Sequence, residues 1–339
     1  MKIDIHTHIM PEHMPNWTKK FGYGEFIHLE ERNCKACMMK GDKVFRVVDK
    51  NTFDAVTRRN ECHSSNVTMQ VLSTIPVLFN YWAKPQDAHD TSRFFNDHIA
   101  ETAAAHPDCF IGLGTVPLQD TDRSIREMER CIRELKMPGI EIGTNVNGKN
   151  LNEDQFIPFF QAAEELGCAI FIHPWEMMGE NDMQKYWLPW LVGMPAETCR
   201  AICSLIFGGI FERFPKLRIA FAHGGGSFPY TLGRIEHGFH VRPDLVQVDN
   251  KINPRDYLGK FWVDSLVHDA HAFRFLTETA GEDRICLGSD YPFPLGEHRP
   301  GELIESMGLP KATEEKFFYK NALEWLNITA TIPAPLSTT

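Results

Sequence analysis

The feature that most restricts the fold is a regular alternation of short apolar runs with longer segments of helical periodicity. Each run is rich in Val, Ile and Phe and closes on a polar or small residue. The eight runs cover residues 2–8, 67–74, 110–116, 139–144, 168–174, 217–223, 261–265 and 284–290. Strands that alternate with helices form βαβ units and a parallel sheet. Eight parallel strands are the number that closes a (β/α)8 barrel, although an open doubly wound sheet shows the same alternation.

The segments between the runs predict helices and two longer connections. Apolar residues recur with helical spacing in 125–135 and 156–166, and Gly167 follows the second segment where a helix C-terminal glycine belongs. The connection after the first run is long enough to hold an inserted, hairpin-bearing subdomain at about 12–50. The second long connection spans 223–260. We therefore expect one domain, 1–328, followed by a polar and disordered tail at 329–339.

Composition excludes several classes of function. With 339 residues, 43% of them hydrophobic, the chain can bury a large core. The net charge of −10, without a long basic run, argues against nucleic acid or an anionic membrane as the main partner. Nine scattered cysteines are typical of reduced intracellular thiols. Lys2 and Asp4 interrupt any signal sequence, and the longest nearly apolar run, 201–211, is shorter than the ~20 residues of a membrane helix. We expect a soluble cytosolic protein.

Polar residues that can bind a metal stand where several of the apolar runs end. His6 and His8 lie one residue apart in the first run, so their side chains share one face of the strand. The fifth run ends in His173, the sixth in His223 and the eighth in Asp290. In a (β/α)8 barrel the active site forms at the C-terminal ends of the strands. These five side chains are therefore expected at one mouth of the barrel.

This set of residues predicts a catalytic zinc site. Zn²⁺ takes imidazole nitrogens and a carboxylate and leaves a position for water, whose pKa then falls to roughly 7. Four of the residues, namely His6, His8, His173 and Asp290, serve as ligands, which leaves His223 as a base toward the water. An HxH pair or a histidine before proline is often structural when it occurs alone. The hypothesis rests on four strand ends that carry such residues together.

Other motifs are incomplete. HGGG at 223–226 is typical of a lipase oxyanion loop, but the chain has no GxSxG nucleophile elbow. CKAC at 34–37 has zinc-like spacing without a second pair of ligands. Cys199 and Cys203 share a helix face and are interpreted as core packing. No GxGxxG, P-loop or HExxH pattern occurs, so no nucleotide site is indicated.

Aromatic and basic residues near these runs are candidates for a substrate pocket. Trp175, Trp187 and Trp190 follow the fifth run, where loop aromatics can wall a pocket. Three arginines lie in the two long connections, and each has a solvated surface position as its default interpretation: Arg46, Arg234 and Arg242. A substrate that carries a carboxylate would need such donors.

Several longer segments resemble one enzyme family. They are the HTH start, VFRVV, LSTIPVLFNYWAKPQD, IHPWEMM, KYWLPWLVGMPAET, FAHGGGSFPYTLGR and LGSDYPFPLGE. Together they resemble the 2-amino-3-carboxymuconate 6-semialdehyde decarboxylases, zinc enzymes of tryptophan catabolism in the amidohydrolase superfamily. The resemblance runs from Met1 to about Ile328 and implies a distorted (β/α)8 barrel.

The resemblance also implies roles for individual residues. The zinc ligands fall on the four residues named above, and the water-activating base falls on His223. Substrate-carboxylate arginines fall on Arg46 and, from the neighbouring subunit of a homodimer, on Arg234, with Arg242 nearby. Pocket aromatics fall on Trp187 and Phe293. The implied reaction is non-oxidative: zinc hydroxide adds next to the departing carboxylate of the muconate, and CO₂ leaves. The product, 2-aminomuconate 6-semialdehyde, diverts material from quinolinate and NAD synthesis.

One stretch departs from the family pattern, and two other interpretations of the chain stay open. FDAVTRRNECHSSN at 53–66 differs from the usual stretch, and Asn66 replaces a glycine at a position where Asn also tolerates the left-handed conformation. The departure puts local stability in doubt but removes no ligand. The first alternative is another zinc enzyme of the superfamily, either a cyclic amide or lactone hydrolase or an aromatic-acid decarboxylase, because fold and metal do not determine the substrate. The second is a catalytically idle zinc-binding scaffold.

Overall fold

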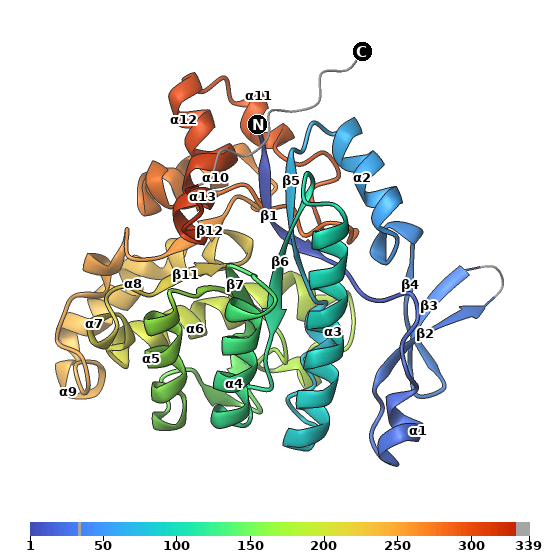
Figure 1. The fold of residues 1–339 in the computed structure, drawn as a ribbon. Helices are drawn as coiled ribbons and strands as arrows, with labels where there is room; N and C mark the ends of the chain where they lie inside the picture. The colour runs from blue at the N-terminus through green and yellow to red at the C-terminus, as the bar shows by residue number, and fades with distance from the viewer. Residues whose placement is uncertain (33–34, 330–339) are drawn as a thin grey trace.

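The computed structural model, which describes residues 1–32 and 35–329, contains a parallel sheet of eight strands in chain order (Figure 1). The strands are β1 (Ile3–His8), β5 (Met69–Ser73), β6 (Phe110–Thr115), β7 (Gly139–Gly143), β10 (Ala169–His173), β11 (Arg218–Phe221), β12 (Trp262–Asp264) and β13 (Ile285–Cys286). Each of the eight apolar runs predicted from the sequence contains one of these strands. Their order, with every neighbouring pair parallel, excludes the doubly wound alternative.

The sheet closes where β1 meets the segment that follows β13. The backbone N–H of Ile5 donates to the carbonyl of Leu287 at 2.9 Å, and that of His8 donates to the carbonyl of Tyr291 at 2.8 Å. Thr7 and Tyr291 also form a parallel bridge. Because β13 is short, the two edges meet through these few contacts rather than a full ladder. The predicted distorted (β/α)8 barrel is confirmed.

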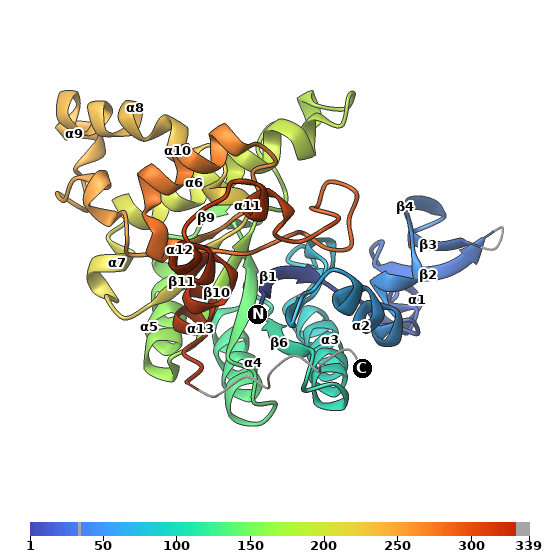
Figure 2. The same ribbon diagram turned by 90° about the horizontal axis from the view of Figure 1, so that it is seen from above.

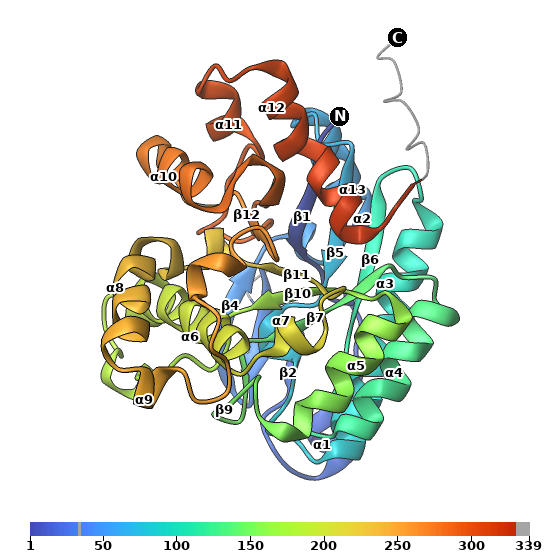
Figure 3. The same cartoon turned by 90° about the vertical axis from the view of Figure 1, so that its left-hand side faces the viewer.

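Helices cover the outside of the barrel (Figures 1 and 3). One follows each strand: α2 (Ala55–Ser64), α3 (Pro85–Ala105), α4 (Thr121–Arg133), α5 (Ile157–Leu166), α6 (Met194–Phe207), α8 (Phe228–Val241), α10 (Ala270–Ala280) and α13 (Asn321–Leu326). The helices predicted at 125–135 and 156–166 correspond to α4 and α5. Gly167 has a φ of 61° and caps α5 in the left-handed conformation, as its position predicts.

Shorter elements complete the connections. They include α1 (Trp17–Phe21), a 3₁₀ turn (Lys50–Thr52), β8 (Asn145–Val146), β9 (Lys149–Asn150), α7 (Ile210–Arg213), α9 (Pro243–Val246), α11 (Glu302–Ser306) and α12 (Lys311–Glu315). The connection predicted at 223–260 contains α8 and α9. One helical stretch, Pro189–Phe207, is long and apolar enough to cross a membrane. Its α6 part packs against the barrel core through Ile202, Leu205 and Ile206, as a core helix does.

The insertion after β1 forms a small antiparallel sheet beside the barrel. It consists of β2 (Ile27–Arg32), β3 (Lys35–Lys40) and β4 (Lys43–Val48), paired in that order. Figure 2 shows this sheet to one side of the barrel, away from α8 and α9. Of the CKAC motif, Cys37 is buried in β3, while Cys34 lies outside the described residues. The tail predicted at 329–339 lies outside them from residue 330 onward.

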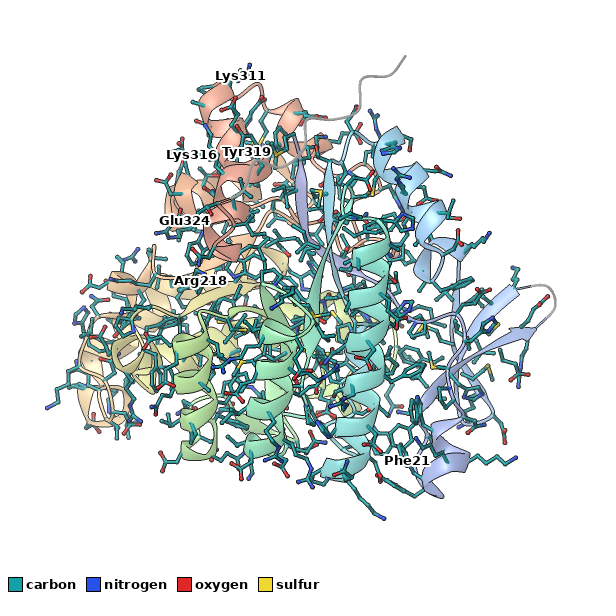
Figure 4. All side chains as sticks on the ribbon, viewed as in Figure 1. Phe21, Arg218, Lys311, Lys316, Tyr319 and Glu324 are labelled. Carbon is teal, nitrogen blue, oxygen red and sulfur yellow. The ribbon has the colours of Figure 1, made fainter. Side chains whose placement is uncertain are left out.

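The end of the barrel opposite the predicted metal ligands is sealed by α13. Trp325 is fully buried there in an apolar cluster with Ile3 and Phe171. Arg218, at the start of β11, lies beneath the end of this helix (Figure 4), and its Nε donates to the carbonyl of Trp325 at 2.7 Å. This closure leaves the strand ends at the other mouth as the accessible side of the barrel.

The close approach of β7 to β10 yields a test of the packing. A Cβ at Gly139 would lie 2.2 Å from the carbonyl oxygen of Ala169, which is backbone and cannot move aside. We expect Gly139→Ala to lower the free energy of unfolding by about 1–3 kcal/mol in urea denaturation. The control is Gly238→Ala in α8, where a Cβ meets nothing within 4 Å. This change should raise the free energy of unfolding by about 0.5–1 kcal/mol. Equal effects of the two changes would contradict the packing described.

Candidate metal centre

Four buried side chains from three parts of the barrel meet at its open mouth. His6 and His8 come from β1, His173 ends β10, and Asp290 follows β13. One nitrogen or oxygen from each of them lies within 4.8 Å of the others. His6 and His8 share this face because they stand two residues apart in a strand. The structure therefore brings together the four residues predicted as metal ligands.

The other ring nitrogen of each histidine has a hydrogen-bond acceptor. Nδ1 of His6 donates to Asp264 Oδ2 at 2.6 Å, and Nδ1 of His8 donates to the carbonyl of Thr74 at 2.8 Å. Nδ1 of His173 donates to the carbonyl of Pro174 at 3.0 Å. Each bond places the proton on Nδ1, so the lone pair of Nε2 is directed at the common centre. This is the tautomer that a metal ion requires.

The atoms around the centre are acceptors that lack protons to share. His6 Nε2 lies 3.2 Å from His8 Nε2, and Asp290 Oδ1 lies 3.2 Å from the same atom of His8. Nε2 of His173 is buried and has no hydrogen-bond partner among residues 1–32 and 35–329. A buried polar atom without a partner is unfavourable, and a cation bound by these lone pairs removes that cost. The donor set fits a divalent metal ion, and the four residues form a metal-binding site.

Burial and neighbouring charges favour the protonation states that metal binding needs. Burial lowers the pKa of His8 and lowers that of His173 well below its usual value. Burial alone would raise the pKa of Asp290, but the neighbouring imidazoles of His223 and His8 outweigh that effect and hold the pKa well below the ordinary range. Neutral imidazoles and an ionised carboxylate are the forms that bind metal.

His223 lies beside the four ligands but does not belong to their group. Its Nε2 is 3.9 Å from Asp290 Oδ2, and its ring centre is 5.0 Å from that of His173. Burial lowers the pKa of His223, but the nearby carboxylate of Asp290 outweighs that effect, so the pKa is raised. A histidine whose imidazole faces the centre beside a carboxylate can act as an acid or a base there.

The HGGG motif forms the turn that presents His223. Residue 223 has a φ of 56°, and the following glycines have φ values of 61°, 78° and 62°. A Cβ at Gly226 would also lie 2.4 Å from the carbonyl oxygen of Pro195. Glycine is required because four successive residues adopt positive φ in a packed turn.

Asp264 is a functional residue that the sequence analysis did not assign. Its buried carboxylate accepts hydrogen bonds from His6 Nδ1 and from the backbone N–H groups of His223, Gly224 and Leu266, at 2.6–3.1 Å. Burial raises its pKa, but the hydrogen bonds from His6 and from the backbone N–H of Gly224 outweigh that effect and the pKa is lowered. The sequence feature that could have identified Asp264 is its position at the end of the seventh predicted strand, where the other site residues also stand. The carboxylate orients both a metal ligand and the turn that carries His223.

A pocket opens above the metal ligands. Its walls include Arg46, Trp175, Trp187, Trp190 and Phe293. The guanidinium of Arg46, brought in by β4, lies 4.5 Å above the ring of Phe293. Burial lowers the pKa of Arg46. The Arg46 side chain forms no salt bridge within the described part of the chain. A half-buried arginine without a paired acid is a donor available to an anionic ligand.

Two predicted substrate arginines lie away from this pocket in the same chain. Arg234 is exposed on α8, and Arg242 is exposed at the end of that helix. Nη2 of Arg242 forms a salt bridge with Asp244 Oδ2 at 2.6 Å. Neither arginine lines the pocket formed by this chain.

Comparison with known proteins relates the whole chain to one family. The family described as amidohydrolase matches residues 3–328. A 2-amino-3-carboxymuconate-6-semialdehyde decarboxylase of Dictyostelium discoideum is 57% identical, over 97% of this chain and 92% of its own. The enzyme of the same name from Caenorhabditis elegans is 38% identical, over 96% and 94%. A 5-carboxyvanillate decarboxylase of Novosphingobium aromaticivorans, solved with manganese, superposes with a TM-score of 0.81 at 24% identity, over 97% and 96%.

The role of Asp264 can be tested through metal affinity. Both oxygens of the Asp264 carboxylate accept hydrogen bonds from backbone N–H groups. In Asp264→Asn one of these oxygens becomes an NH₂ group, which is itself a donor and therefore faces a backbone N–H without an acceptor. We expect this change to weaken metal binding about 10- to 100-fold in a competition titration with a chromophoric chelator. Asp269→Asn is the control, because Asp269 is exposed and only caps α10, a position that Asn also suits. Wild-type affinity in Asp264→Asn would refute the role.

Proposed function

The chain belongs to the amidohydrolase family and is a decarboxylase of that family, and from this we propose that it removes CO₂ from 2-amino-3-carboxymuconate 6-semialdehyde. The product is 2-aminomuconate 6-semialdehyde. The observation that carries the proposal is the four-residue metal site within a chain that is 57% identical to an enzyme of that name. In the cytosol this reaction would belong to tryptophan catabolism and divert material from quinolinate and NAD synthesis.

Zinc is the metal we propose for the site. Three imidazole nitrogens and one carboxylate oxygen in a buried cluster are a donor set typical of catalytic Zn²⁺. Elemental analysis of the purified chain distinguishes zinc from manganese, the metal with which a 5-carboxyvanillate decarboxylase of this fold has been solved. Such an ion, when bound, lowers the pKa of a water to roughly 7 and acts as a Lewis acid.

His223 moves the protons of the reaction. Its imidazole takes a proton from the water, whose hydroxide would add to the carbon next to the one that carries the departing carboxylate. The imidazolium gives that proton to the carboxylate-bearing carbon, which becomes saturated. When the bond to CO₂ breaks, its electron pair forms the carbon–carbon double bond again and the added hydroxide leaves. The raised pKa of His223 and its position 3.9 Å from Asp290 support this role. Asp264 holds the turn through the His223 N–H, so the imidazole keeps its direction.

The pocket above the centre binds and orients the substrate. Arg46 donates to a substrate carboxylate, for which its planar guanidinium is suited. Trp187 and Phe293 enclose the conjugated chain between aromatic surfaces. Binding the carboxylates at a defined place holds the carbon that loses CO₂ close to the water and to His223.

We further propose that the competent unit is a homodimer in which Arg234 reaches the neighbouring subunit's pocket, with Arg242 close by. The surface formed by α8 and the segment after it exposes several large apolar side chains: Tyr230, Val241, Leu245 and Val248. Such a surface is typical of a subunit interface. Arg234 lies on the same exposed helix, which is where a donor to a second subunit must stand.

A second candidate substrate is an aromatic acid. Relatives named gamma-resorcylate decarboxylase are 28–29% identical over 62–69% of this chain, and the aromatic pocket walls would also accept a benzoate. The two candidates separate in a direct assay. Incubation with the semialdehyde should release CO₂ as its absorbance falls, while turnover only of dihydroxybenzoates would favour the second candidate.

Replacement of His223 tests the reaction and the assigned role together. We expect His223→Ala to keep its full complement of metal and to lose about 10²- to 10⁴-fold in turnover of the semialdehyde. His271→Ala, at an exposed position in α10, serves as the control and should keep wild-type turnover. Metal content is measured on the same samples by elemental analysis. Near-normal activity in a metal-loaded His223→Ala chain would exclude this histidine as the base.

Mixed dimers test the donation of Arg234 across an interface. His223→Ala and Arg234→Ala chains are inactive alone in this scheme, but their heterodimer contains one native site. Co-expression should therefore restore about a quarter of wild-type activity, because half of the dimers are mixed and each has one working site. Co-expression of His223→Ala with Arg46→Ala should restore activity in the same way only if Arg46 also crosses the interface. Because Arg46 lines its own chain's pocket, we expect no recovery there. No recovery in the first mixture would contradict donation between subunits.

A further inference from the structure

Arg58, in α2, is a fully buried arginine that forms no salt bridge among the described residues. It lies in the stretch 53–66, where the sequence analysis expected no influence on the metal ligands. Burying a guanidinium is unfavourable unless its N–H groups are satisfied. The acceptors that Arg58 uses therefore show what the arginine holds in place.

The guanidinium contacts elements from different parts of the chain. Nη1 donates to the carbonyl of His8 at 2.6 Å and to that of Asn51 at 3.0 Å. Nη2 donates to Oε1 of Gln70, in β5, at 3.0 Å. The Cζ atom of the Arg58 guanidinium lies 4.7 Å from the centre of the Tyr291 ring, which is a cation–π contact. In Figure 1, α2 lies beside β1 and β5, next to the elements that Arg58 joins.

Two of these contacts bear directly on metal ligands. His8 is a ligand itself, and Tyr291 immediately follows the ligand Asp290. The carbonyl of Tyr291 accepts from the N–H of His8 at 2.8 Å. The hydroxyl of Tyr291 donates to the carboxylate of Glu61, one turn after Arg58 in α2, and the same carboxylate accepts from Nδ2 of Asn51 at 3.0 Å. Arg58 and Glu61 thus hold both sides of the junction at which the barrel closes.

We propose that Arg58 is a positioning residue for the metal centre: through the His8 carbonyl and the Tyr291 ring it sets the separation of His8 and Asp290. A guanidinium suits this task because its donors form a rigid planar fork that one flexible lysine ammonium cannot reproduce. Groups that orient metal ligands typically change metal affinity when they are removed. The inference rests on the proposed metal site and does not depend on the identity of the substrate.

The test compares two variants of Arg58 with a neighbour on the same helix. Arg58→Met keeps the length of the side chain and removes the donors, and Arg58→Lys keeps the charge. Arg59→Met is the matched control, because Arg59 is partly exposed and bonds Asp108 at 2.5 Å, away from the centre. Each full-length chain is measured for Zn²⁺ release to a chromophoric chelator and for the visible absorption spectrum of its Co²⁺ form.

We expect Arg58→Met to weaken Zn²⁺ binding about 10- to 100-fold and to shift the Co²⁺ absorption bands. Arg58→Lys should recover part of the affinity, and Arg59→Met should match the wild type in both measurements. Thermal unfolding of the metal-free chains separates this effect from a general loss of stability. A lower melting temperature in Arg58→Met with unchanged Zn²⁺ affinity and an unchanged Co²⁺ spectrum would overturn the proposal.

A second variant covers the case in which Arg58→Met does not fold. Tyr291→Phe keeps the ring under the guanidinium and removes the hydroxyl bond to Glu61. We expect a several-fold loss of Zn²⁺ affinity and a smaller change in the Co²⁺ spectrum. Wild-type values for Tyr291→Phe beside an unfolded Arg58→Met would assign the network to folding alone. A wild-type chain that binds metal but does not decarboxylate the semialdehyde would refute the proposed function and leave this comparison intact.

Discussion

The arrangement on which the site depends is the meeting of three imidazole lone pairs and a carboxylate at one buried point. The Nε2 atoms of His6 and His8 lie 3.2 Å apart, and neither carries a proton to share. Such a cluster does not hold itself together, because acceptors that face one another repel. The surrounding structure must therefore impose it through the Nδ1 bonds, the carboxylate of Asp264 and the elements that carry each ligand. The cation that stabilises the cluster is also the reagent of the proposed chemistry.

The ligands span the least regular part of the barrel. His6 and His8 lie on the first strand and Asp290 follows the last, and these edges meet through a few backbone bonds rather than a ladder. Two buried ionisable side chains, Asp4 and Arg58, reinforce this junction. Asp4 accepts from the backbone N–H groups of His6 and Ser289, at 3.2 and 3.1 Å, and burial raises its pKa to about 7. Arg58, which lies on α2 outside the sheet, contacts the His8 carbonyl and the Tyr291 ring at the same junction. At this junction, polar side-chain contacts hold the two edges together, whereas elsewhere in the sheet backbone pairing between strands holds them.

The sequence could predict the strands and the metal ligands, but not the residues that hold the ligands in place. Period-two spacing placed His6 and His8 on one face, and parallel strands bring their carboxyl ends to one mouth. Asp264 and Asp290 both follow apolar runs, and nothing local distinguishes a carboxylate that binds metal from one that orients a ligand. The contact between His6 and Asp264 joins residues 258 positions apart. Arg58 and Arg59 are alike in sequence, and only the packing of α2 decides which one is buried.

The elements that line the pocket come largely from outside the regular barrel. Arg46 lies on the inserted sheet, Trp187 and Trp190 follow β10, and Phe293 follows β13. These segments can vary in length and sequence without disturbing the strands that carry the ligands. Family members with one metal centre can therefore act on different acids, since the barrel supplies the proton and metal chemistry and the attached segments select the carboxylate. In the homodimer that we propose, selection depends on Arg46 and an arginine from the second subunit binding the substrate's carboxylates at the same time.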